Sequence, residues 1–463
     1  MPNSTTMHTT VFIRRLYMLL TTLIVGASAL PAQTLDDYIC EGLAKNLAYR
    51  QQRLALAQSD ESVSEARGGF LPSITLNARA TELYGNVINL GNLINPAYAT
   101  LNQLTGSNVF PTNLDIRLPL QRETKLELRQ PLIQPKVLFN YQIKAHLRDA
   151  TEAETEAKAR ELVAQIKVAY LNYAKTLKVV ELYAETVSLL EENVRVNQSL
   201  VKNEKATLDA LYRAEAELAD VKQGQADALR LNEASRQFFN FLLDRPLASP
   251  IALVSDTAFA SLSLDALQRS ATKREELKQI QSGIAATEKV VSLSTADFFP
   301  TLSLGVDYGF QGNRYDFSSD QDFATVSLVA QWNIFNGFQD KAKREQAKIE
   351  TNRLNTRYKE LESQIALQVR TTYDDATVAQ QNIAVAEARL RAAEASFNLV
   401  SKKYAQGQVS QVEFLDSRTA FTNASINAVI TRYDAYIKQA ELERAAATLN
   451  LSQFTTKLNG EKQ

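Results

Sequence analysis

The stretch RGGFLPSITLNARA, residues 67–80, changes from a helix-like to a strand-like pattern. Gly68, Gly69 and Pro72 interrupt the helical pattern, and polar and apolar residues alternate after them. A period of two places successive side chains on opposite faces of a strand. The stretch TADFFPTLSLGVDYGF, residues 295–310, repeats this change, with large apolar residues on one face and small or polar residues on the other. We therefore predict that a mostly helical chain contains strands with two different faces.

Composition limits the function classes. The chain has 463 residues, of which 45% are hydrophobic and 22% charged, as is ordinary for a folded protein. A formal charge of −1 without any Lys/Arg block argues against a nucleic-acid partner. Histidine occurs only at His8 and His146, and the single cysteine, Cys40, allows no intrachain disulfide and is expected to pack within a helix. Since no catalytic or nucleotide-binding motif is present either, we expect no enzyme, no cofactor and no metal site.

The N-terminus has the layout of a secretory signal. Arg14 and Arg15 precede the apolar run LYMLLTTLIVGASAL, and small residues follow it. A single membrane anchor is the alternative, but the run is short for a span of about 20 residues. We assign residues 1–32 as a signal peptide, with cleavage after either Ala29 or Ala32.

The rest of the chain contains an internal repeat. QIKVAYLNY at 165–173 resembles LQVRTTYDD at 367–375, and LELRQPLI resembles SLVAQWNI. We predict repeat 1 at 33–245, a linker at 246–262 and repeat 2 at 263–463. Each repeat has the order helix, strand, loop, strand, long helix, turn, long helix.

The expected elements follow from this alignment. Strands are predicted at about 72–83, 122–133, 300–311 and 322–334. Helices are predicted at about 34–66, 136–202, 207–243, 263–297, 338–405 and 409–455. The first repeat carries additional residues rich in Asn and Gly between its two strands, at 84–113, and we predict a loop there.

The long helices carry apolar seams. Apolar residues recur every three or four positions from Leu162 to Val201, which is the spacing of coiled-coil packing. A second stripe lies roughly opposite the first, so this helix is expected to have neighbours on two sides. On its own, the pattern also fits a soluble helical bundle or a spacer coiled coil.

The strands distinguish between these possibilities. Segments of about 10 to 12 alternating residues are long enough to cross a bilayer as tilted strands. An open sheet in lipid would leave backbone groups unpaired at its edges, at several kcal/mol each. Two copies would form a narrow eight-stranded barrel, whereas three copies give twelve strands and space for a pore. We therefore predict strands that build a barrel jointly with other copies; a small amphipathic sheet on a soluble domain is the alternative.

Three segments resemble the TolC-type outer-membrane efflux proteins. They are TLDDYICEGLAKNLAYRQQRLALAQSDESVSEARGGFLPSITL, its echo LDALQRSATKREELKQIQSGIAATEKVVSLSTADFFPTLSL, and KKYAQGQVSQVEFLDSRTAFTNA. The resemblance implies a homotrimer with a twelve-stranded β-barrel in the outer membrane of a Gram-negative bacterium, in contact with its lipid and continued by a periplasmic α-helical barrel. It also implies a passive exit duct for efflux or type I secretion, served by a periplasmic adaptor and an inner-membrane pump of the RND or ABC type. Leu47 and Glu275, at helix starts, replace a proline of many members.

The resemblance also implies a gate where the long helices turn. By position, Glu413, Asp416 and Asp209 match acidic residues of the family's constriction, and Tyr404 matches a tyrosine that holds it shut. Val409 stands where an arginine of that latch can occur, which puts a charge-paired latch in doubt. The adaptor is expected to dock on the two turns, at Asn203, Lys205, Gly407, Gln408 and Ser410.

Local physics supports the acidic ring independently. Glu413 and Asp416 are three residues apart, hence on one face of a helix, near the start where negative charge is favourable. An ordinary solvated helix start explains the same pattern without a gate. The alternative function for the whole chain is a periplasmic helical scaffold or adaptor without a pore.

Trp332, at the end of a predicted strand, is expected either at the membrane boundary or packed between strands and helices.

Overall fold

The computed structural model describes residues 33–85, 88–118, 120–253, 263–314, 316–451 and 453–454. The predicted signal peptide and most of the predicted linker lie outside the described residues. The chain forms two compact units, each of which combines segments from both halves of the sequence. Unit 1 is built from residues up to Gln52, Glu156–Arg274 and the segment that starts at Glu362; unit 2 is built from Arg53–Thr155 and Glu275–Leu361.

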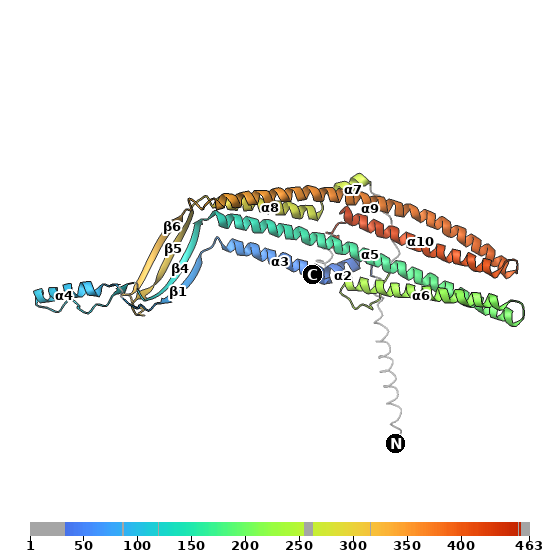
Figure 1. Ribbon diagram of the computed structural model, residues 1–463, viewed down its shortest axis with the longest axis horizontal. Helices are drawn as coiled ribbons and strands as arrows, with labels where there is room; N and C mark the ends of the chain where they lie inside the picture. Colours follow the sequence, from blue (N-terminus) through green and yellow to red (C-terminus); the bar gives the residue numbers. More distant parts are fainter. Residues whose placement is uncertain are drawn as a thin grey trace, which may run out of the picture. The chain divides into compact units, whose positions relative to one another are not determined.

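Unit 2 contains a four-stranded antiparallel sheet of order β1-β4-β5-β6 (Figure 1). Its strands are β1 (Ser73–Ala80), β4 (Arg122–Ile133), β5 (Thr301–Gly312) and β6 (Asp322–Gln331). All four predicted strands are therefore present, and their bounds differ by no more than a few residues from those predicted. Within the described chain, β1 pairs only with β4 and β6 only with β5, so both edges of this sheet are open.

The register gives the sheet one apolar and one polar face. Leu126 lies between Leu76 and Tyr308, whereas Glu127 lies between Thr75 and Asp307. Directly paired residues project to the same side, so this alternation continues across all strands. The apolar face is formed mainly by Ile74, Leu76, Ala78, Leu126, Leu128, Leu302, Leu304, Val306, Tyr308, Phe310, Ala324, Val326 and Leu328.

Opposite charges alternate along the polar face. Arg79 contacts Glu123 at 3.1 Å, Lys125 contacts Glu123 at 3.4 Å and Glu127 at 2.7 Å. Arg129 then contacts Glu127 at 3.5 Å and continues to Asp307 on β5. We call these six residues the charge ladder; its three basic and three acidic side chains leave it without net charge.

Glycines on β5 make room for the charge ladder. A Cβ atom at Gly305 would lie 2.8 Å from Nη1 of Arg129, and one at Gly309 would lie 2.5 Å from Cβ of Lys125. The missing side chains therefore allow the long basic residues of β4 to lie against the neighbouring strand.

Helices make up most of the chain. They are α2 (Leu35–Lys45), α3 (Leu47–Gly68), α4 (Gly91–Thr105), α5 (Pro135–Lys202), α6 (Leu208–Leu242), α7 (Leu264–Ala271), α8 (Glu275–Ala296), α9 (Gln339–Ala405) and α10 (Gln411–Ala445). Among the described helices, none has a stretch that is both long and apolar enough to cross a lipid bilayer.

Two helices predicted as continuous are interrupted. The predicted helix at 34–66 breaks at Asn46, whose side chain accepts a hydrogen bond from the Tyr49 amide and donates one to the Leu242 carbonyl, both at 2.9 Å. Asn46 thus caps α3 and ties the break to α6. The predicted helix at 263–297 is likewise split into α7 and α8. The last helix ends at Ala445 rather than near 455.

The prediction of a simple loop at 84–113 is wrong. The segment contains α4, and the two-residue strands β2 (Ile88–Asn89) and β3 (Arg117–Leu118) pair at its base. Asparagine side chains hold the returning chain against the helix. Asn95 exchanges two hydrogen bonds with the backbone of Leu114, and Asn102 does the same with Phe110, at 2.7–2.9 Å. The asparagines that indicate a loop in the sequence instead bind the backbone of the returning chain through their side chains.

The core of unit 1 surrounds α5. Val163, Ile166 and Phe239 are fully buried, and Tyr38 packs edge-on against Phe239 at 5.1 Å between ring centroids. The predicted seam on α5 is confirmed, since Leu162, Ile166, Ala169, Tyr173, Val187, Leu190 and Val194 are all buried. Cys40 is buried in the same core, as predicted.

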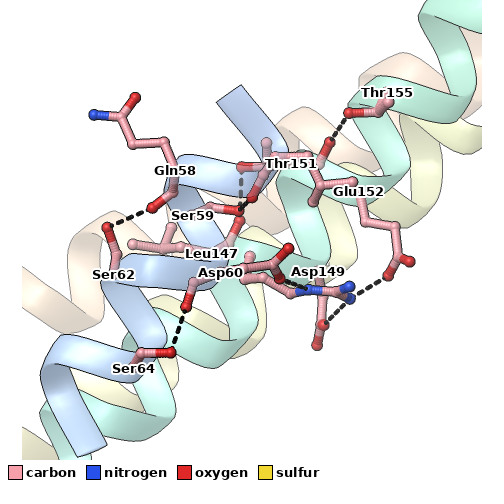
Figure 2. A network of polar contacts seen from close by, with 12 residues as sticks. Gln58, Ser59, Asp60, Ser62, Ser64, Leu147, Asp149, Thr151, Glu152 and Thr155 are labelled. Atoms are coloured by element: carbon pink, nitrogen blue, oxygen red, sulfur yellow. Dashed lines mark hydrogen bonds and ion pairs between the residues drawn. The ribbon is translucent and has the colours of Figure 1, made fainter. Parts of the chain in front are cut away.

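Within unit 2, an ionic network joins α3 to α5. Asp60 on α3 contacts the guanidinium of Arg148 at 2.9 Å, and Glu152 on α5 contacts it at 2.5 Å. Figure 2 labels both acidic residues and marks the polar contacts around them with dashed lines. Asp149 contacts the same guanidinium at 3.5 Å. The hydrogen bond to Asp60 raises the pKa of Arg148 above its usual value, since it stabilises the charged guanidinium. All four side chains are part-exposed, so the network orients the two helices more than it stabilises them.

Candidate functional site

The long helices of unit 1 form two hairpins, α5–α6 and α9–α10 (Figure 1). The turns of the two hairpins have the same backbone geometry. In the first turn Glu204 has a positive φ of 55° and the Lys205 amide donates to the Leu200 carbonyl at 2.8 Å. In the second, Gly407 has a φ of 71° and the Gln408 amide donates to the Lys403 carbonyl at 2.9 Å. This is the Schellman arrangement that commonly ends an α-helix.

Glu204 holds the left-handed position of the first turn that Gly407 holds in the second. Asn203 donates its side-chain amide to the Ser199 carbonyl at 2.7 Å. The Asn203 backbone amide donates to the same carbonyl at 3.1 Å, so the side chain adds a second hydrogen bond at the helix end.

The second helix of each hairpin starts at a hydroxyl residue. Thr207 occupies the N-cap of α6 and Ser410 that of α10. The Ser410 hydroxyl accepts a hydrogen bond from the Glu413 amide at 3.2 Å, which is the usual capping contact. Ser410, predicted as an adaptor-docking residue, therefore also has a structural role.

Glu413 and Asp416 lie on the first turns of α10 and are exposed. Neither carboxylate forms an ion pair with any described residue. Their three-residue spacing places them on one side of the helix. The structure thus brings together two uncompensated negative charges at the start of α10.

Asp209 has a different environment. Its carboxylate accepts a hydrogen bond from Arg213 on the same helix at 2.9 Å, so its charge is compensated. Counted from the two turns, Arg213 corresponds to Asp416 and Ala210 to Glu413. The two hairpins therefore share their geometry but differ in charge at these two positions, where the second has free carboxylates and the first has Ala210 and Arg213.

Tyr404 packs against the start of α10. Its ring stacks on Phe414 with 4.6 Å between centroids and 16° between the ring planes. Phe414 continues to Phe397, which stacks on Phe421 at 5.4 Å. These rings join the end of α9 to α10, so Tyr404 contributes to the packing of the hairpin whatever further role it has.

Polar contacts join the two hairpins close to their turns. The Gln411 side chain donates to the Ala210 carbonyl at 2.7 Å, and Arg418 pairs with Glu217. The hydroxyl of Thr419 donates to the same carboxylate at 3.0 Å. In both main contacts the residues are 201 positions apart, so α6 and α10 run parallel in a common register.

Arg418 is unusually buried for a charged residue. Only 2% of it is exposed, and its Nε and Nη1 atoms have no hydrogen-bond partner among the described residues. Burial lowers the pKa of its guanidinium, while the Glu217 carboxylate acts in the opposite direction. A buried arginine with one carboxylate contributes little net stability, but it strongly disfavours any arrangement that separates the pair.

The predicted docking residues are accessible. Asn203, Lys205, Gly407, Gln408 and Ser410 are all exposed, and they lie at the ends of the two hairpins. Val409, which stands where a latch arginine can occur, is part-buried and provides no charge. At this end of unit 1, the described cross-hairpin charge pair is Arg418 with Glu217.

Trp332 follows β6, is 59% exposed and donates its indole N–H to the Phe298 carbonyl at 3.1 Å. It therefore marks the end of the sheet where β6 stops. In the described part of the chain, no group of three or more His, Cys, Asp and Glu side chains has the arrangement of a metal site.

Sequence reasoning missed Arg418, Glu217 and the charge ladder. The period-two charges of ETKLELR signal that Glu123, Lys125, Glu127 and Arg129 share a face. No comparable signal identifies Arg418 and Glu217, since their pairing depends on how two distant helices are aligned.

Comparison with known proteins identifies the fold. Residues 266–448 match the family model for the outer membrane efflux protein. The Campylobacter jejuni CmeC outer membrane channel superposes with a TM-score of 0.74 and 14% identity, over 92% of this chain and 89% of that chain. The outer membrane protein VceC of Vibrio cholerae gives a TM-score of 0.73 at 16% identity, over 89% and 95%.

A third similar structure is the Neisseria gonorrhoeae MtrE outer membrane channel in its open state, with a TM-score of 0.71 and 18% identity over 89% of each chain. A search of proteins with curated functions found no match. The predicted fold class of long helices with a four-stranded sheet is confirmed, and so is the predicted resemblance.

The buried pair between the hairpins generates a stability prediction. Glu217→Gln leaves the buried Arg418 without its counter-charge, and Arg418→Ala leaves a cavity beside an unpaired Glu217. Each variant should lower the free energy of unfolding by about 3 kcal/mol. The double variant Arg418→Met/Glu217→Met should recover most of this loss. Denaturant unfolding of the purified protein, followed by circular dichroism, measures all three.

Arg230→Ala is the matched control, because Arg230 contacts Asp227 on the same helix at 3.9 Å and is exposed. Its effect should stay below about 1 kcal/mol. If the single variants behave like this control, Arg418 and Glu217 do not act as a buried pair.

Proposed function

We propose that this chain, whose residues 266–448 match the family model for the outer membrane efflux protein, is one of three copies that build the exit duct of an efflux or type I secretion system. The family is one of outer-membrane channels and not of enzymes, in agreement with the prediction from the sequence. Transport through the duct is passive, and selection of the cargo is left to an inner-membrane pump of the RND or ABC type.

The observation that carries this proposal is the two-faced sheet with its open edges. On the apolar face Ile74, Leu76, Val326 and Leu328 are each at least 64% exposed in the single chain. The charge ladder occupies the other face. In a bilayer the charged face must avoid lipid, because a Lys or Arg toward the membrane centre costs about 2–4 kcal/mol. The apolar face therefore suits lipid and the polar face suits water.

The open edges require further strands. Each unpaired backbone group in lipid costs several kcal/mol, so β1 and β6 must pair with strands of other copies. Three copies supply twelve strands, enough for a barrel with an aqueous interior. The charge ladders would then line this interior, where their neutrality favours neither cations nor anions.

The helices also carry faces that suit neighbouring copies. Val378, Val385 and Leu399 on α9 are all more than half exposed in the single chain. Their spacing by multiples of seven is that of a coiled-coil seam. These positions support a helical barrel in which α9 packs against another chain.

The trimer is tested by mass. We expect native mass spectrometry of the protein purified in detergent to return three chains per particle. The physical reason is that only closure by other copies satisfies the edges of β1 and β6. A stable monomer or dimer that keeps the native strand content would refute the proposed barrel.

We assign the gate to Glu413 and Asp416. Three copies would place six free carboxylates at the narrow end of the helical barrel, where their field attracts cations. Asp209 contributes less, since Arg213 compensates its charge. The Arg418–Glu217 pair and the stacking of Tyr404 on Phe414 hold the start of α10 in place, and thus act as positioning contacts for the carboxylates.

The exposed turns are the proposed adaptor site. Asn203 and Lys205 on one hairpin, with Gly407, Gln408 and Ser410 on the other, would face a periplasmic adaptor at the inner end of the duct. Their side chains are short or flexible and polar, so the contact would rely on backbone shape and hydrogen bonds more than on apolar burial.

The gate is tested by ion selectivity. Glu413→Ala/Asp416→Ala removes six charges from the trimer and should weaken cation selectivity in single-channel recordings in a planar bilayer. Block by trivalent cations should be lost as well. Both side chains are exposed, so the variant should fold normally.

Glu61→Ala/Glu65→Ala is the matched control, because these two glutamates are exposed on one face of α3 and lie far from the turns in the sequence. Its selectivity should equal that of the unchanged protein. Full selectivity in the Glu413/Asp416 variant would mean that these acids belong to an ordinary helix start.

A further inference from the structure

The segment from β2 to β3, residues 88–118, forms a projection that the proposed duct does not explain. We call it the finger. It leaves the sheet after β1 and returns before β4, and its base is tied to the sheet. The Thr81 amide donates to the Gln121 carbonyl at 2.7 Å, and Asn313, beyond β5, donates to the Asp115 carbonyl at 2.9 Å. The finger is thus rooted at the end of an edge strand.

One side of α4 is fully used inside the finger. Asn95 and Asn102 lie seven residues apart, hence on the same side of the helix, and both bind the returning chain. Tyr98 adds a ring contact with Phe110 at 5.4 Å between centroids. An isolated helix of this length is marginal in water, so these contacts make α4 a preformed element.

The opposite side of α4 is apolar and exposed. Leu93 and Leu104 are 76% and 78% exposed, and Ala97 lies between them on the same side. Together with Thr100 they follow the 4-3-4 spacing of a coiled-coil seam. Among the described residues, no other segment covers this seam.

The finger also lacks charge. Residues 85–114 contain no Asp, Glu, Lys or Arg, although 22% of the whole chain is charged. Helices that lie on a membrane surface usually carry Lys or Arg on their polar side, and α4 has none. A lipid surface is therefore a poor match. An identical uncharged helix is a good match, since like helices can converge without charge repulsion.

We propose that the α4 seams of three copies pack against one another and form a three-helix cap at the outer rim of the barrel. This inference rests on the proposed trimer, because closure of the barrel places three fingers at the same rim next to the seams between copies. The cap gives the duct a second narrow point, built from apolar contacts rather than from charge.

Two alanines of α4 provide a matched test. Ala97 lies on the seam and Ala99 lies about 200° around the helix from it, and both are exposed in the single chain. Each is changed to Cys in a Cys40→Ala background. The detergent-purified protein is then treated with a mild oxidant, and non-reducing gels show the disulfide-linked chains.

We expect Ala97→Cys to give linked pairs, with at most two of the three chains in each trimer joined. Ala99→Cys should remain unlinked, since a disulfide needs Cα atoms within about 7 Å. Adding Leu93→Asn and Leu104→Asn to Ala97→Cys should abolish linking while the particle still has the mass of three chains.

A verified trimer in which neither cysteine links, or both link equally, contradicts the cap but not the duct. Linking of Ala97→Cys to a different protein in cells also contradicts it, because the seam then serves another partner. A particle that is not a trimer overturns the proposed function itself, and the cap with it.

Discussion

The unpaired edges of the four-stranded sheet are the constraint on which the rest of the structure depends. Backbone groups in a bilayer must find partners within protein, and the described sheet has two edges without them. The same sheet carries a full charge ladder on one face and exposed leucine, isoleucine and valine on the other. A single chain cannot satisfy both requirements, whereas a closed ring of chains satisfies them together.

The long helices, unlike the sheet, need no neighbour to satisfy their backbone groups. Their backbone groups form hydrogen bonds within each helix, so side chains determine how the helices align with one another. Apolar seams align the helices, and the Arg418–Glu217 pair fixes the register of α10 against α6 near the turns. That register decides where Glu413 and Asp416 stand. The acidic positions are therefore set by a buried pair whose arginine follows Asp416 by two residues and Glu413 by five on α10.

Much of the fold could be predicted from the spacing of apolar residues along the sequence alone. The strands were predicted because alternation distinguishes their two faces, and the α5 seam because its spacing matches helix packing. The break at Asn46 was not predicted, since it depends on a hydrogen bond to Leu242 across the fold. The α4 helix was not predicted because asparagine usually indicates a turn. Here the asparagine side chains instead bind the backbone of the chain that returns along the helix.

The candidate site shows the same division. The spacing of Glu413 and Asp416 predicted a shared face, but compensation of Asp209 by Arg213 depends on side-chain geometry. The pairing of Arg418 with Glu217 could not be predicted, because 201 positions separate the two residues in the sequence. Charge ladder residues on β4 were readable in principle, while their partners Arg79 and Asp307 required the strand order.

The central claim, that one face of the sheet meets lipid and the other water, is tested most directly on β6. Single cysteines at 324–328 in a Cys40→Ala background are labelled with a small fluorophore, and the protein is placed in lipid vesicles. Fluorophores at Val326 and Leu328 should be quenched by spin-labelled lipid, and those at Thr325 and Ser327 by aqueous iodide. Equal iodide quenching at all positions, with no quenching by lipid, would show that the sheet does not span a membrane.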